Sequence, residues 1–234
     1  MDRPFDYGLL KTGNGGTQGL YRYRYSDSGE RVDNITGWAF NEFVSQYGKR
    51  VTRDAIFYYV YAVLHDPIYL ETYRLDLKRE FPRIPFYSDF RQWATWGKAL
   101  LNLHTGYEKL EPWPITKVNV ATSRAITGTY ARPILRSYSN VGTAVIDTDT
   151  EVTGNPPKAW SYRLGNRSAI DWVLDQYREK KPRDAIIATK FNDYRLSDYK
   201  EQLIEILAKV VRVSVDTVAI TDAMRLSGRR IRIE

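Results

Sequence analysis

The sequence predicts an α+β domain, in which a helical N-terminal part and C-terminal spacer helices surround a small β-rich lobe. Three stretches of differing pattern lead to this fold class. Residues 34–111 repeat apolar side chains at helical spacing, whereas residues 112–162 form short β-type runs broken by Gly, Pro, Asn and Asp. Helical spacing then returns from residue 168 to residue 226.

The same changes of pattern set the expected organisation of the chain. A polar, Gly-rich stretch near the start predicts a flexible lead-in over 1–18, and no internal repeat is evident. One folded domain is expected over 19–228, followed by a basic tail over 229–234. Within the folded domain we expect a mainly helical part, the β-rich lobe and the C-terminal helices, over 19–111, 112–162 and 163–228.

A strand is expected at residues 20–25, where tyrosine and arginine alternate. A period of two places Tyr21, Tyr23 and Tyr25 on one face, with Arg22 and Arg24 on the other. Side chains of these two kinds could stack on bases and hold phosphates. The favoured alternative for this pattern is an edge strand with its tyrosines packed inward.

The first expected helix covers residues 34–47. Asn34 is its expected N-cap and Gly48 its stop. Its apolar positions fall on one stripe. The stripe consists of Ile35, Trp38, Ala39, Phe43 and Tyr47.

Two further helices are expected before residue 81. One opens at Thr52 and ends near His65. The next opens at Asp66–Pro67, an N-cap followed by a proline at the first helical position, and is expected to continue to about Glu80. Residues 81–85 must run extended, because each of their two prolines also restrains the residue before it.

A longer helix is expected from a cap at Ser88 to about Leu110. It carries His104, and the preceding helix ends with His65, so both histidines lie among apolar residues. We interpret each as a structural histidine rather than a catalytic one.

Short strands and then two helices complete the expected elements. The strands are expected at 115–121, 129–135 and 141–147. Ser168 caps a helix to about Lys180, with Trp172 on its apolar side, and Ser197 opens a long helical stretch to about Leu226.

Composition excludes several classes of function. The 234 residues contain no cysteine and only two histidines, which rules out thiolate metal sites, disulfide scaffolds and Cys nucleophiles. The net charge is +7, and residues 161–234 carry 15 basic and 11 acidic residues, so this third holds most of the excess per residue. A polyanionic partner is therefore expected, with a solvated basic face as the alternative.

Three short motifs suggest chemistry, but each has a simpler interpretation. Residues 155–158 (NPPK) are similar to the tetrad of amino-methyltransferases, but Lys158 replaces the aromatic residue that stacks on the flipped base. Asp147, Asp149 and Glu151 alternate as in a metal-dependent nuclease, yet a polar hairpin loop is favoured because no lysine follows at the required spacing. Residues 13–16 lack the Gly-Lys-Ser/Thr ending of a phosphate-binding loop. We therefore expect no catalytic residue, metal or cofactor in this chain.

Several longer motifs, in order along the chain, resemble the C-terminal target recognition (specificity) domain of type ISP restriction–modification enzymes. They are 33–36 (DNIT), 56–69 (IFYYVYAVLHDPIY), 77–86 (LKREFPRIPF), 97–104 (GKALLNLH), 166–177 (NRSAIDWVLDQY) and 213–218 (VSVDTV). The resemblance covers about residues 20–222. It implies that residues 19–228 read a double-stranded DNA target for adenine methyltransferase and helicase–nuclease domains, which belong to the same or a partner polypeptide.

The residues expected to contact DNA are polar side chains of the β-rich lobe and cations of the basic C-terminal third. They are Arg22, Arg24, Arg124, Arg132, Arg136, Ser137, Asn140, Lys158, Arg163, Asn166, Arg167, Lys180, Lys181, Arg183 and Lys190. Because Arg167 and Ser168 fall where a family motif starts a helix, they have a structural role as their alternative.

The alternative function is a protein-interaction module that docks on a separate methyltransferase or on a full-length restriction enzyme. Exposed apolar surface on the 52–80 helix pair or the 199–226 helix would form the docking face. The expected location is the cytoplasm, with no membrane contact, because no apolar run is long enough to span a bilayer.

Overall fold

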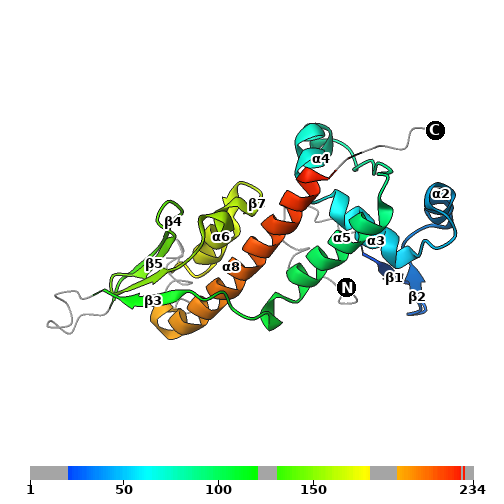
Figure 1. Ribbon diagram of the computed structural model, residues 1–234. Helices are drawn as coiled ribbons and strands as arrows, with labels where there is room; N and C mark the ends of the chain where they lie inside the picture. The colour runs from blue at the N-terminus through cyan, green and yellow to red at the C-terminus, as the bar shows by residue number, and fades with distance from the viewer. Residues whose placement is uncertain (1–20, 121–130, 180–193, 228, 230–234) are drawn as a thin grey trace. The chain divides into compact units, whose positions relative to one another are not determined.

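The computed structural model describes residues 21–120, 131–179, 194–227 and 229, and it confirms the α+β class (Figure 1). The expected lead-in over 1–18 lies outside these residues. The chain divides into two compact units. We call residues 1–101 with 227–234 the helical unit, and residues 102–226 the sheet unit.

The helical unit begins with a two-stranded antiparallel sheet. Strand β1 (Tyr23–Tyr25) pairs with β2 (Arg31–Asp33), a strand that the sequence pattern did not predict. The inward-tyrosine interpretation of β1 is wrong, because Arg22 is the buried side chain and Tyr25 is 56% exposed. Arg22 can be buried because two carboxylates pair with its guanidinium: its Nε lies 2.7 Å from Asp54 Oδ1, and Asp33 accepts its second hydrogen bond.

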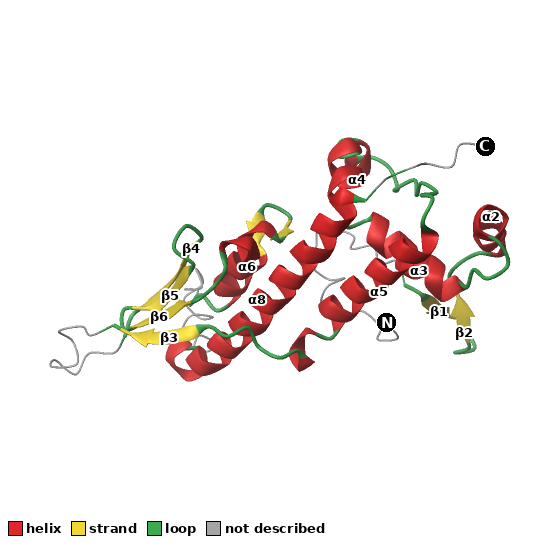
Figure 2. Ribbon diagram, in the orientation of Figure 1, coloured by secondary structure: helices red, strands yellow, loops and turns green. Residues whose placement is uncertain are grey.

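Helices α2 (Gly37–Tyr47), α3 (Arg53–Val63), α4 (Pro67–Thr72) and α5 (Phe90–Thr105) follow, with a 3₁₀ turn, η1 (Asp76–Lys78), after α4 (Figure 2). The predicted caps Thr52 and Asp66 are confirmed, since their side chains accept hydrogen bonds from Ala55 N and Ile68 N. Residues 81–85 are not helical, as their two prolines predict.

Five local predictions in this unit are wrong. Thr36, not Asn34, caps α2, and α4 ends at Thr72 rather than near residue 80. The α5 helix ends at Thr105, and its first turn is capped by Asp89, whose Oδ1 accepts from Gln92 N at 3.2 Å. Trp38, expected on the apolar stripe of α2, is 74% exposed, because among the described residues only Phe43 of that helix reaches the core.

The core of the helical unit is aromatic. Phe43, Tyr59 and Phe90 contact one another with ring centroids 5.2–6.0 Å apart. Helices α3 and α5 approach closely at Gly97, where a Cβ atom would lie only 1.7 Å from the Tyr58 carbonyl oxygen. Glycine is therefore the residue that this crossing requires.

The sheet unit contains a four-stranded antiparallel sheet in the order β3-β6-β5-β4. Its strands are β3 (Thr116–Asn119), β4 (Pro133–Tyr138), β5 (Thr143–Asp147) and β6 (Thr150–Thr153). The expected strand at 129–135 is shifted toward the C-terminus, and β6 was not predicted. The expected polar hairpin after Asp147 is confirmed, since residues 148 and 149 form the turn between β5 and β6.

Two helices cover this sheet, and shorter elements connect them. The helices are α6 (Ala169–Gln176) and α8 (Leu196–Leu226), and the shorter elements are η2 (Tyr107–Lys109), η4 (Pro157–Ser161), β7 (Arg163–Leu164) and β8 (Arg167–Ser168). The core joins Ile146 and Val152 of the sheet to Leu174 of α6 and Leu207 of α8. Ser168 caps α6 as predicted, but the helix ends at Gln176 and Trp172 is 46% exposed.

Candidate nucleic-acid interface

The edge strand β4 and the turn that follows it present polar side chains to solvent. Arg136 on β4 and Asn140 in the β4–β5 turn are both exposed, and Tyr138 between them is 44% exposed. In the described part of the chain, the exposed Arg136 guanidinium has neither an ion pair nor a side-chain hydrogen bond.

The side chain of Asn155 fixes the β4–β5 turn. The buried Asn155 donates from Nδ2 to the carbonyl oxygens of Gly142 and Val152, each at 3.0 Å. Gly142 has φ +65°, and a Cβ atom there would lie 2.4 Å from the Asn155 carbonyl oxygen. The asparagine of the NPPK motif therefore fixes a turn, and this contact positions the neighbouring Asn140.

The second polar hairpin, β7–β8, carries three of the predicted residues. Arg163, Asn166 and Arg167 are all exposed. Arg163 donates to the Asn166 carbonyl across the turn, and Arg167 pairs with Asp175 at 2.9 Å. The turn is tight because Gly165 adopts φ +67°.

A hydrogen-bond network joins the two hairpins. Asp171, on α6, accepts from Ser137 on β4 through Oδ1 and from Ser168 on β8 through Oδ2 at 2.6 Å. Ser137 also accepts from Trp160 Nε1 at 2.9 Å. We call these four residues the Asp171 network. Arg136 and Arg167 each directly precede a serine of this network. The network therefore fixes the backbone positions from which the two arginine side chains extend.

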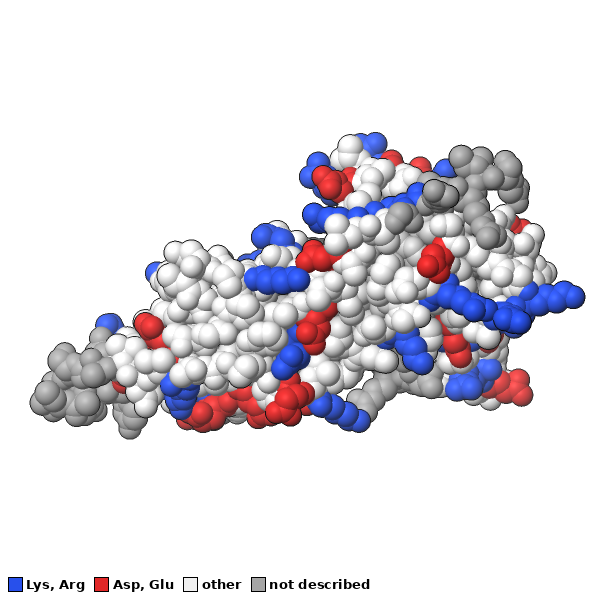
Figure 3. Space-filling model, in the orientation of Figure 1, with Lys and Arg blue, Asp and Glu red and all other residues white. Residues whose placement is uncertain are grey.

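Charge is distributed unequally over the sheet unit. Figure 3 shows Lys and Arg side chains over the α6 and β7 region, and a row of Asp and Glu where α8 begins. The exposed acids of this part of α8 are Asp198, Glu201 and Glu205. This distribution favours an anionic ligand at the hairpins over the start of α8, where Lys117 and Lys209 pair with two of the acids.

The structure places the remaining predicted residues in different surroundings. Lys158 on η4 pairs with Asp222 at 3.0 Å, and the exposed Arg132 lines a pocket of about 620 Å³ beside β4. Arg22 and Arg24 belong to the helical unit, where Arg22 is buried and Arg24 exposed. The other predicted contacts lie outside the described residues. They are Arg124, Lys180, Lys181, Arg183 and Lys190.

Both histidines have structural partners. Burial, the larger effect, lowers the pKa of His65, and its hydrogen bond with the Tyr61 carbonyl opposes this only in part. His104 stacks on Tyr162 with ring centroids 5.5 Å apart, and its Nε2 lies 3.0 Å from Thr217 Oγ1. Burial raises the pKa of the Tyr162 hydroxyl.

Sequence reasoning missed Asp171 and Trp160. The Ser-x-x-Asp spacing of residues 168–171 is close to a capping box, and it could have drawn attention to Asp171. Its contact with Ser137, 34 residues away, has no local signal. Ser137, one of the predicted DNA contacts, donates to Asp171 and accepts from Trp160, which ties β4 to α6.

Comparison with known proteins places this arrangement in a family. Residues 1–206 match the family model of the Type ISP C-terminal specificity domain. No curated protein sequence matches the chain significantly. Among solved structures, that of a DrdV–DNA complex is similar, with 42% sequence identity, a TM-score of 0.80 and coverage of 90% of this chain and 21% of that chain.

Two solved type ISP restriction–modification enzymes are similar as well. A nuclease-deletion mutant of LlaGI, in complex with a DNA substrate mimic, shares 26% identity at a TM-score of 0.65, covering 91% of this chain and 18% of that one. LlaBIII bound to DNA, an ATP-dependent enzyme, shares the fold at 23% identity and a TM-score of 0.68, with coverage of 90% and 13%. The chain thus spans about a fifth or less of the length of these structures. Because the family model covers most of its residues, this protein belongs to the Type ISP C-terminal specificity domain family.

Proposed function

We propose that this chain reads the sequence of a DNA duplex as the specificity domain of a type ISP restriction–modification enzyme in the cytoplasm. Adenine methylation and DNA cleavage would be performed by methyltransferase and helicase–nuclease domains outside these residues. Family membership supports this function, and so does the similarity to a DrdV–DNA complex at 42% identity. Among the described residues, no helix is both long and apolar enough to cross a membrane.

The observation that carries the proposal is the Asp171 network, which holds two exposed polar hairpins at a fixed spacing. Such hairpins can place side chains at base edges while neighbouring cations contact phosphates. We assign base contacts to Arg136, Asn140 and Asn166. We assign backbone contacts to Arg24, Arg124, Arg132, Lys158, Arg163, Arg167, Lys180, Lys181, Arg183 and Lys190, and we leave Arg22 and Ser137 as positioning residues.

Selection from a random-sequence duplex pool tests the proposal directly. The 234-residue chain should enrich one motif, and the logarithm of its affinity for that motif should fall with the logarithm of salt concentration by several units of slope. Weak binding without enrichment, lost near physiological salt, would refute sequence reading by this chain.

A substitution at Arg136 tests the assignment of the hairpins. Arg136→Gln should weaken binding to the selected duplex by about 1–3 kcal/mol and relax selection at one base pair, since arginine can make paired hydrogen bonds to guanine. Lys109→Gln is the matched control, because Lys109 is an exposed cation of the same unit on η2. Equal effects of both substitutions would show that Arg136 contributes charge without reading a base.

A second role is favoured by apolar side chains around α4 and η1. Leu75 is 63% exposed and Phe81 67% exposed. Apolar exposure of this kind marks docking surfaces. Since the chain spans a fifth or less of its solved relatives, other domains of such an enzyme are the expected partner. Leu75→Ser/Phe81→Ser should weaken association with a separately purified type ISP methyltransferase part in analytical ultracentrifugation, while DNA selection stays the same.

A further inference from the structure

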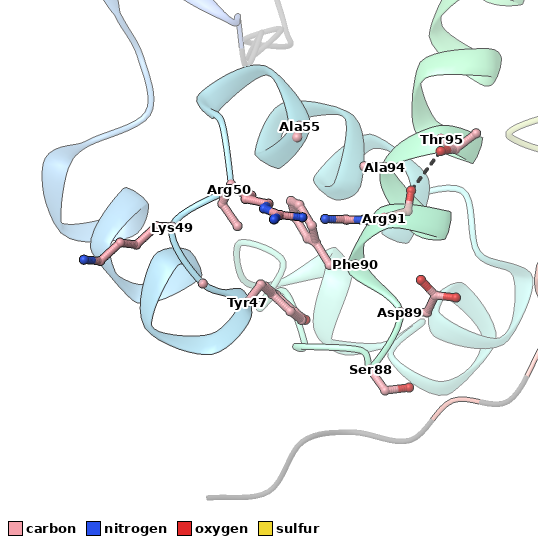
Figure 4. A pocket seen from close by; sticks show the side chains of 12 residues that line it. Tyr47, Lys49, Arg50, Ala55, Ser88, Asp89, Phe90, Arg91, Ala94 and Thr95 are labelled. Atoms are coloured by element: carbon pink, nitrogen blue, oxygen red, sulfur yellow. Dashed lines mark hydrogen bonds between the residues drawn. The ribbon is translucent and has the colours of Figure 1, made fainter.

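The helical unit contains a pocket of about 800 Å³ where the end of α2, the α2–α3 connection and the start of α5 meet (Figure 4). Its floor is apolar, formed by the buried side chains of Val51, Phe90 and Ala94. The size lies within the usual range for ligand pockets.

Cations dominate the rim of this pocket. Lys49, Arg50 and Arg91 line it and are all exposed, against one carboxylate, that of Asp89, so the lining residues carry a net charge of +2. Figure 4 shows the guanidinium groups of Arg50 and Arg91 directed toward each other, whereas the Lys49 side chain extends away from them. Like charges facing one pocket repel each other unless an anion lies between them.

The nearby carboxylates do not neutralise these cations. Asp33 and Asp54 pair with Arg22, and Asp89 accepts from Gln92 N as the cap of α5. Within the described ranges, no ion pair or side-chain hydrogen bond forms on Lys49, Arg50 or Arg91. Within that part of the chain, Arg50 and Arg91 are therefore available to an external anion that lies between them.

We propose that Arg50 and Arg91 bind a phosphate group, which in the DNA complex is a phosphodiester of the duplex backbone. Arginine forks suit phosphate because they offer two parallel N–H donors to its oxygens. The first turn of the 16-residue α5 lines the same pocket, and the positive end of its dipole, where Asp89 caps Gln92 N, favours negative charge. The helical unit thus adds a sequence-independent contact to the base-reading hairpins. This inference rests on the proposed function.

DNA binding by the intact chain tests the role of the pocket. Arg50→Gln/Arg91→Gln should lower affinity for the selected duplex and for unrelated duplexes by the same factor, and should reduce the salt slope by about 1 unit per lost phosphate contact. Arg74→Gln/Arg79→Gln is the matched control, because it removes two exposed cations of the same unit that lie outside the pocket. Equal slopes for both double variants would overturn the proposal.

Inorganic phosphate separates failure of this site from failure of the proposed function. At constant ionic strength, phosphate should raise the Tm of the wild type and of the control variant relative to chloride, but not that of Arg50→Gln/Arg91→Gln. Phosphate stabilisation that depends on the two arginines, without any change in the DNA salt slope, would overturn the assignment to the DNA backbone. Absence of both effects would overturn the site itself. A wild type that binds phosphate but no duplex would refute the proposed function and leave the pocket a site for free phosphate.

Discussion

At the residue scale, His65 links protonation to stability. Its half-buried ring contacts the tilted ring of Tyr61 with centroids 4.4 Å apart, and burial lowers its pKa below the ordinary value of about 6.5. Below about pH 6.5 the His65 imidazole binds a proton in the unfolded chain but remains neutral in the folded chain until the pH is lower. The contribution of His65 to the free energy of unfolding is therefore complete above that pH. It is lost as the pH falls toward the lowered pKa of the folded state.

The free energy of unfolding should accordingly decrease as the pH falls below about 6.5. His65→Gln, which keeps a donor for the Tyr61 carbonyl, should flatten this decrease. Urea titrations of both proteins at several pH values measure the two slopes. Identical slopes would show that His65 does not couple protonation to folding.

The burial and ion pairs of Arg22 could not be predicted from the sequence around it. Its alternation with tyrosines predicted a side chain open to phosphate, yet it lies buried between Asp33 and Asp54. Burial by itself would lower the pKa of Arg22, but its hydrogen bonds to the two carboxylates reverse this and raise it. Asp33 is 11 residues from Arg22 in sequence and Asp54 is 32 residues away, so no local sequence pattern predicts these ion pairs.

At the scale of elements, the crossing of α3 and α5 depends on Gly97. Gly97→Ala should lower the free energy of unfolding by about 3 kcal/mol or more, because a Cβ atom 1.7 Å from a backbone oxygen forces two packed helices apart. Gly37→Ala is the control, since nothing lies within 4 Å of a Cβ atom at that first position of α2. Its effect in the same denaturation experiment should stay within about 0.5 kcal/mol.

The Asp171 network makes a prediction for the sheet unit. Asp171→Ala removes acceptors from Ser137 and Ser168, and should cost about 2 kcal/mol of unfolding free energy. Amide exchange should accelerate in β4, which loses its tie to α6, more than in β6 at the middle of the sheet. Asp198→Ala, an exposed acid of α8, is the control. Equal acceleration in β4 and β6 would contradict a role specific to the hairpins.

At the scale of the whole molecule, Arg229 ties the end of the chain to the helical unit. Its Nε lies 2.9 Å from Oδ2 of Asp66, a fully buried carboxylate that also caps α4. Arg229→Met should cost about 3–5 kcal/mol, because it leaves that charge buried without its cation. Adding Asp66→Asn should recover part of the loss, which a double-mutant cycle by chemical denaturation would measure.

The exposed pair Arg83–Glu80 provides the comparison for this cycle. Its two side chains are 91% and 63% exposed, so Arg83→Met should cost less than about 1 kcal/mol. A loss of the same size at Arg229 would mean that the buried pair contributes no more than a surface pair.

Much of the architecture follows from local signals. The sequence predicts four helix ends correctly, because each is a hydrogen bond between residues close in sequence. They are the caps at Thr52, Asp66 and Ser168 and the end of α2 at Gly48. The predicted ends of α4 near residue 80 and of α5 near residue 110 lie beyond the observed ends, since apolar residues continue into the 3₁₀ turns η1 and η2. Which face is buried was less predictable: Trp38 and Trp172 fit an apolar stripe and are nevertheless exposed.

The sequence by itself determined the α+β class, the order of most elements and the family, because caps, periodicity and ordered motifs are properties of neighbouring residues. Only the tertiary structure decided which polar side chains are open to a ligand. Ser137, Asn155 and Arg22 carry the same chemistry as Arg136 and Asn140, but their partners come from distant segments and occupy their hydrogen-bonding groups. The cationic pocket lined by Lys49, Arg50 and Arg91 likewise exists only because folding brings Arg50 and Arg91, 41 positions apart in sequence, to one rim.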